Sequence, residues 1–128
     1  MSEAATVVAA TVAIVVLAAL AVLQVLVALG RPYGRLVWGG QHRILPRRLR
    51  IGSAVSVLLY AAFAAILLWQ AGLIGDAGAV AQVATWVLFA YFAVGVVLNA
   101  ISRSRPERIV GTLASAVLAA CTLVIALP

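Results

Sequence analysis

The sequence has 128 residues, which is the length of a single domain. Hydrophobic residues make up 66% of it and charged residues 9%, whereas soluble domains average about 45–50% and about 25%. So little polar surface excludes a water-soluble globule, and the single cysteine excludes a disulfide scaffold. The composition predicts an integral membrane protein in which residues 1–128 form one membrane domain.

The basic residues indicate what the protein contacts, and the overall composition indicates what kind of organism it comes from. All nine are arginines, against three acids, and the net charge is +6. Because they flank apolar segments, they favour contact with anionic lipid headgroups over nucleic acid. The abundance of Ala, Val, Leu, Gly and Arg is typical of a GC-rich bacterial coding sequence. We therefore expect a multi-pass protein of the bacterial cytoplasmic (inner) membrane.

Four apolar stretches follow one another along the chain, at residues 4–29, 49–70, 77–101 and 109–127. Each is close to the roughly 20 residues that a helix needs to cross a bilayer. Backbone groups in lipid must be satisfied within a segment, so the stretches are predicted to be helices. They are apolar nearly all round, which argues against a soluble bundle with polar helix faces. The predicted fold is all-α, an integral membrane four-helix bundle.

The first stretch has an alternative interpretation as a cleaved signal peptide. Its start, Met1-Ser2-Glu3, is acidic, and its apolar run exceeds the usual 7–15 residues of a signal sequence. A retained helix is the prediction.

The arginines predict the orientation. Six lie between the first and second stretches and three between the third and fourth, while the N-terminus and the loop around Asp76 carry none. Basic connections face the cytoplasm, so both should be cytoplasmic. The N- and C-termini and the Asp76 loop are expected outside.

The connection at residues 30–48 is the longest segment outside the predicted helices. Its glycines and prolines favour tight turns, which indicates an ordered re-entrant or surface-lying loop. The candidate residues for contact with lipid headgroups or a protein are Arg35, Trp38, Gly39, Gly40, Gln41, His42, Arg43, Arg47, Arg48 and Arg50. A second interpretation is that the arginines only set topology. We expect Glu107 to form an ion pair with one of these arginines or with Arg103.

Short motifs in this region carry a resemblance. The loop contains Trp38-Gly39-Gly40-Gln41-His42, Leu45-Pro46 and Leu49-Arg50-Ile51-Gly52-Ser53, and the later connection contains Asn99, Ser102, Ser104 and Glu107-Arg108. Together these motifs resemble a pattern in a family of small four-span membrane proteins of bacteria. The resemblance covers most of the chain and implies the four-span fold, and it brings no activity with it.

Polar residues within the predicted spans suggest a second candidate site. Ser53, Ser56 and Tyr60 share one helix face, and with Gln82 and Asn99 they form a candidate intramembrane polar stripe. Helix packing explains such residues more simply than a substrate path does. No ionisable residue lies inside a span, which argues against proton-driven export.

The sequence offers little for catalysis. His42 and Cys121 are the only residues of their types, so no metal set or redox pair is expected, and no cofactor. No nucleophile–base pair is visible, and an enzyme is not expected. The predicted function is a non-enzymatic accessory or structural subunit, with lipids, itself or a larger membrane complex as partners. The alternative is a small homo-oligomeric transporter or channel for a neutral or anionic solute.

Overall fold

The computed structural model describes all 128 residues and contains only helices. The four long helices are α1 (Glu3–Ala28), α2 (Arg47–Gln70), α3 (Ala79–Ala100) and α4 (Arg105–Ala126). Each is long and apolar enough to cross a membrane. The predicted all-α, four-span fold is confirmed.

Two helices begin earlier than the apolar pattern suggested. The second was expected from residue 49 and starts at Arg47, directly after Pro46. The fourth was expected from residue 109 and starts at Arg105, with Pro106 in its first turn. Proline fits the first helical turn because the missing N–H would have no helical partner there. The apolar pattern marks the hydrocarbon span, and both helices continue past it with an arginine-bearing turn.

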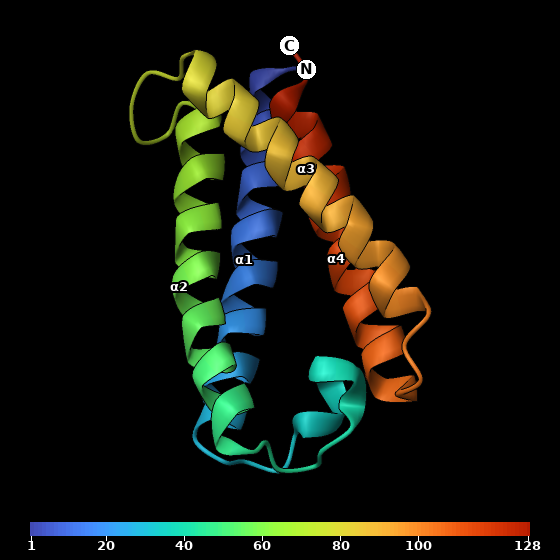
Figure 1. The fold of residues 1–128 in the computed structure, drawn as a ribbon. Coiled ribbons are helices and arrows are strands. Elements are labelled where there is room, and N and C mark those ends of the chain that lie inside the picture. Colours follow the sequence, from blue (N-terminus) through green and yellow to red (C-terminus); the bar gives the residue numbers. More distant parts are fainter.

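The helices form two antiparallel pairs, α1 with α2 and α3 with α4 (Figure 1). Both termini and the loop at residues 71–78 lie at one end of the bundle, here termed the terminal end. The connections at residues 29–46 and 101–104 lie at the opposite end, termed the basic end. The two pairs pack together toward the terminal end and diverge toward the basic end, as Figure 1 shows.

The main core accordingly lies in the terminal half. It joins all four helices and consists of ten buried residues: Ala9, Ala10, Ala13, Leu17, Leu67, Leu88, Phe92, Leu118, Cys121 and Ile125. The alanines on α1 let neighbouring backbones approach closely, which is how helices associate where lipid removes the hydrophobic driving force. Large side chains elsewhere, such as Leu58 and Val80 at 72% exposure each, face outward and would contact lipid.

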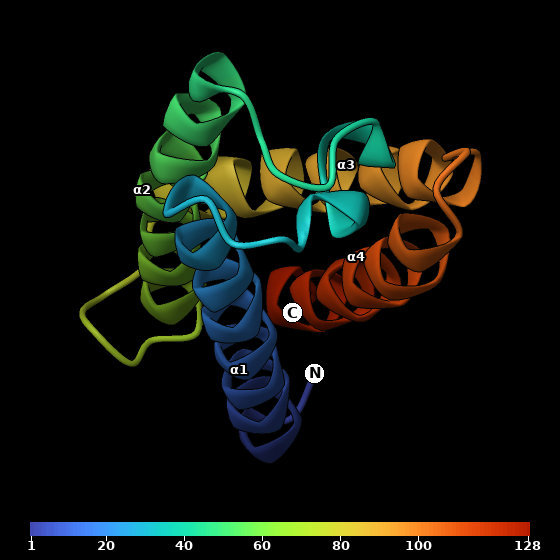
Figure 2. The same ribbon diagram turned by 90° about the horizontal axis from the view of Figure 1, so that it is seen from below.

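The α1–α2 connection folds back under the bundle, between the diverging pairs (Figures 1 and 2). It contains two short 3-10 helices, η1 (Gly34–Leu36) and η2 (Trp38–Gly40). Val37 and Leu45 pack with Val27 of α1 in a second small core. This packing makes the connection an ordered part of the fold.

Candidate functional site

Trp38 holds the α1–α2 connection to α2. Its indole Nε1 donates a 2.9 Å hydrogen bond to Oγ of Ser53, which is fully buried. The ring lies over Gly52, where an added Cβ would come within 2.8 Å of the indole. Trp38 has a φ of 51°, a left-handed conformation that costs a non-glycine residue about 1–2 kcal/mol. The contacts with Ser53 and Gly52 offset that cost and make Trp38 an anchor.

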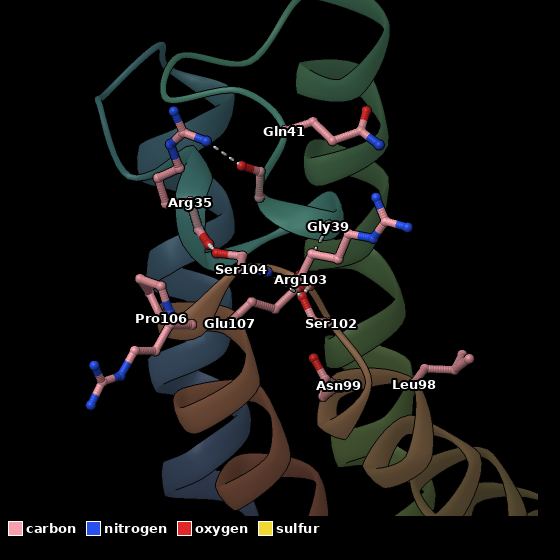
Figure 3. A pocket seen from close by; sticks show the side chains of 12 residues that line it. Arg35, Gly39, Gln41, Leu98, Asn99, Ser102, Arg103, Ser104, Pro106 and Glu107 are labelled. Carbon is pink, nitrogen blue, oxygen red and sulfur yellow. Dashed lines mark hydrogen bonds between the residues drawn. The ribbon is translucent and has the colours of Figure 1, made fainter.

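A second group of contacts holds the connection to the α3–α4 turn (Figure 3). The N–H of Gly39 donates to a carboxylate oxygen of Glu107 over 3.2 Å, and the Ser104 hydroxyl donates to the carbonyl of Arg35. Gly40 lies so close to Ser104 that a Cβ would sit 2.2 Å from its side chain. We term these contacts the clasp. They join segments almost 70 residues apart, because Gly39 and Glu107 are separated by 68 positions.

Glu107 does not form the pair with an arginine that the sequence predicted. Its second carboxylate oxygen accepts a 2.6 Å hydrogen bond from the Ser102 hydroxyl. The carboxylate therefore bonds a backbone amide and a hydroxyl, and the predicted ion pair is not formed. The Arg103 side chain extends away from it in Figure 3. The physical reason is that the left-handed turn brings the Gly39 N–H within reach of the carboxylate, whereas the Arg103 guanidinium is exposed and is hydrated by water.

All nine arginines are exposed, and all lie at the basic end. Three of them, Arg35, Arg50 and Arg108, each donate one hydrogen bond to a backbone carbonyl of the same end. The side chains of the other six make no hydrogen bond to the rest of the protein: Arg31, Arg43, Arg47, Arg48, Arg103 and Arg105. The basic end therefore presents positive charge that the chain itself leaves unneutralised.

The basic end is hollowed between the connection and the α3–α4 turn. The open depression has a volume of about 850 Å³, and Arg35, Arg103 and Arg105 are among its lining residues. In Figure 3 the guanidinium groups of Arg35 and Arg103 point in different directions. The charge is thus spread over a surface, and this suits a broad acidic partner better than one small anion.

The predicted contact loop divides into two functional parts. Trp38, Gly39 and Gly40 make the internal contacts described above, and Gly40 is buried. Gln41 and the arginines are exposed, and His42 is half-buried. The glycines and the tryptophan shape the scaffold, and the arginines form its outer surface.

The predicted polar stripe does not run continuously through the bundle. Ser53 is covered by Trp38, and Gln82 lies at the terminal end, where it donates to the Ala126 carbonyl. Ser56, Tyr60 and Asn99 do line one cavity. Gln82 lies in the first turn of α3 and Asn99 in its last turn. The 17 residues between them correspond to a rise of about 25 Å, so the two side chains cannot belong to one site.

Two further residues of this cavity were missed as site residues. Gln24 donates to the Tyr60 hydroxyl over 3.4 Å, and Ser115 accepts from Asn99 over 3.2 Å. Gln24 is the most polar residue of the first span, and that was the available signal. Ser115 belongs to a row of small residues on α4, and in the sequence such a row indicates helix packing only.

The remaining candidate chemistry is sparse. Cys121 is buried in the core of α4 with a free thiol. No three His, Cys, Asp or Glu side chains come together to hold a metal ion. No protein-family model, curated protein or solved structure matches this chain.

Proposed function

We propose that this chain is a non-enzymatic accessory subunit of a membrane complex, and that its basic end contacts an acidic surface of a larger partner protein. The observation that carries the proposal is the set of nine exposed arginines gathered at one end of the bundle. The only acid at that end, Glu107, is used by the clasp. Positive charge on an ordered scaffold favours a complementary partner and a fixed register of contact.

The placement of the arginines at helix starts supports this proposal. Arg47 and Arg48 open α2, and Arg105 opens α4. A cation near a helix N-terminus opposes the macrodipole, at a cost of about 0.3–1 kcal/mol each. Such a local conflict is expected where a residue serves a function outside the helix.

Orientation in the membrane explains part of this charge, because basic residues favour the cytoplasmic side. Orientation does not require a folded loop, however, since an unstructured one with the same charges would suffice. Here Trp38 and the clasp fix the loop against the helices. A fixed array of guanidinium groups supports recognition of a protein surface over topology alone.

The alternative of a small transporter or channel has less support. A solute path needs polar groups along the bundle axis, and the predicted stripe is divided between its two ends. Between them, Leu17, Leu67 and Leu118 are fully buried in the apolar core of the terminal half. This core leaves no polar route through a single chain, so the accessory role is the better supported proposal.

The test is a mild-detergent purification of the full chain from its native membrane, followed by mass spectrometry of the proteins retained. We expect one larger protein at stoichiometric amount. The double variant Arg47→Glu/Arg48→Glu should reduce its recovery by about tenfold or more, because reversing a charge turns attraction into repulsion. Seven arginines remain in that variant, so the orientation signal persists.

The matched control is Arg47→Lys/Arg48→Lys, which keeps both charges and should retain most of the partner. Full recovery with the glutamate pair would overturn the contact surface. Recovery of the chain only as a homo-oligomer would overturn the accessory role and favour transport instead.

A further inference from the structure

A second feature of the molecule lies inside the bundle, where the two helix pairs diverge. It is a cavity of about 330 Å³ between the core and the basic end. Residues of all four helices line it, and so do Val37 and Trp38 of the connection at its basic end. Its size falls in the range of sites for small molecules, and its lining, with thirteen hydrophobic residues of twenty, has the apolar character of such sites.

Gln24 brings an unsatisfied polar group to this cavity. The side chain is 8% exposed, and its Nε2 donates to the Tyr60 hydroxyl. Its Oε1 is buried and has no hydrogen-bond partner. A buried amide oxygen without a hydrogen-bond partner is costly in an apolar setting. A ligand that donates a hydrogen bond to Gln24 Oε1 would remove this cost.

Tyr60 offers the complementary group. Its hydroxyl oxygen accepts from Gln24, while its own proton has no acceptor in the protein. Tyr60 and Gln24 therefore provide one donor and one acceptor next to each other. A hydroxyl group satisfies both at once, since it donates to the Gln24 carbonyl and accepts from the Tyr60 hydroxyl.

Across the cavity, Asn99 and Ser115 form a second polar pair. The Asn99 Nδ2 donates to the Gly95 carbonyl over 2.7 Å and to the Ser115 hydroxyl over 3.2 Å. No donor bonds the Asn99 Oδ1, which lies against Gly111. Polar groups thus converge on the cavity from α1, α2, α3 and α4, within an otherwise apolar lining.

The surroundings of the cavity indicate where a ligand comes from. Tyr91, Val94 and Leu98 of α3 line the cavity and are also 54%, 56% and 60% exposed. They lie in a membrane-spanning helix, so their exposed sides face lipid. Phe92, which lines the cavity, packs edge to face against Phe63 at 5.7 Å on the side of the core. The exposed sides of these α3 residues offer a lateral route from the bilayer into the cavity.

Charge restricts the class of ligand further. Glu107, at the end of the cavity near the connection, is the only charged residue of the lining, and its carboxylate is used by the clasp. An anionic head would find no counter-charge in this lining and would face the Glu107 carboxylate, which is unfavourable in an apolar environment. A neutral head is therefore favoured over an anionic one.

We propose that this cavity binds a neutral bilayer amphiphile whose small head carries a hydroxyl group, held between Gln24 and Tyr60. Diacylglycerols and quinols share this chemistry. The inference is independent of the proposed contact at the basic end, because it uses none of the exposed arginines.

The test is a binding titration of the purified full chain in detergent micelles by native mass spectrometry. The probes are dioctanoylglycerol and a short-chain benzoquinol, each compared with its O-methylated analogue. A methyl ether keeps the acceptor and loses the donor, so it should bind about tenfold more weakly, as expected when a buried carbonyl stays unpaired. The probe that shows this difference identifies the source of the hydroxyl group.

Variants locate the site. Gln24→Leu should abolish the preference for the hydroxyl probe, whereas Gln82→Leu, the same change at the terminal end, should leave it intact. Ala114→Phe fills the cavity and keeps its polar groups, and it should abolish binding even if Gln24→Leu folds poorly. Equal binding of hydroxyl and methyl ether probes, an unchanged preference in Gln24→Leu, or no binding of either hydroxyl probe would each overturn the proposal.

Discussion

Trp38 shows how one side chain supports two parts of this molecule. Its indole is fixed on α2 by Ser53 and Gly52, and the same residue lines the cavity between the helix pairs. The sequence placed Trp38 at headgroup depth among the contact residues. Its hydrogen bond to a serine 15 positions later could not be inferred, because a bond between a loop and a helix leaves no periodic signal in the sequence.

Replacing this residue tests its role as an anchor. Trp38→Phe keeps an aromatic ring near Gly52 and removes the Nε1 donor, so we expect a loss of about 0.5–1.5 kcal/mol in unfolding free energy. The measurement is a denaturant titration of the full chain in bicelles. Trp86→Phe is the control, because the Trp86 indole makes no hydrogen bond and is 38% exposed. A Trp38→Phe loss no larger than that of the control would contradict the anchor role.

At the scale of elements, the four spans were predictable and the positions of their connections were not. Apolar length alone identifies the spans because lipid forces each of them into a helix. The arginine-bearing first turns of α2 and α4 were missed because they lie outside the apolar pattern. Glu107 was expected to pair with an arginine of the α1–α2 connection or with Arg103, and it bonds the Gly39 amide instead. Only the left-handed turn at Gly39 and Gly40 exposes that amide, and such a turn depends on tertiary contacts.

Removing the carboxylate should release the connection. Glu107→Ala deletes both hydrogen bonds of the side chain, and a hydrogen bond to a charged group contributes about 1.5–3 kcal/mol. We expect trypsin to cut after Arg43, Arg47 or Arg48 at least about tenfold faster in the folded protein. Glu3→Ala, which removes the same charge at the terminal end, is the control. Equal cleavage rates in the Glu107→Ala and Glu3→Ala variants would argue against the clasp.

At the scale of the whole molecule, both basic connections gather at one end and both termini at the other. This arrangement agrees with the alternation of four spans and gives the molecule a strongly asymmetric charge. Which end faces the cytoplasm is a prediction from the arginines. The site was less predictable than the fold. Gln24 and Asn99 line the same cavity because the two helix pairs diverge around it, and the sequence does not show how the pairs are placed relative to each other.

Sidedness can be measured with single cysteines in a Cys121→Ala background. Gln41→Cys places an exposed thiol at the basic end and should react with a membrane-impermeant reagent only after the cells are opened. Asp76→Cys, at the terminal end, should react in intact cells. Gln41 is preferred over its neighbour Gly40, where any side chain would collide with Ser104. Labelling of Gln41→Cys in intact cells would reverse the orientation.

The clasp also sets an order of events during synthesis. Gly39 cannot meet Glu107 until 68 more residues have been added, which takes roughly 3–15 s at about 5–20 residues per second. During that interval α2 and α3 are completed, and the loop can already make its contacts with α1 and α2, whereas its partners in the clasp are still missing. The newborn loop is then free to meet anionic headgroups and fix the orientation of the first pair. The arrival of α4 then adds the clasp to those contacts and completes the folded surface.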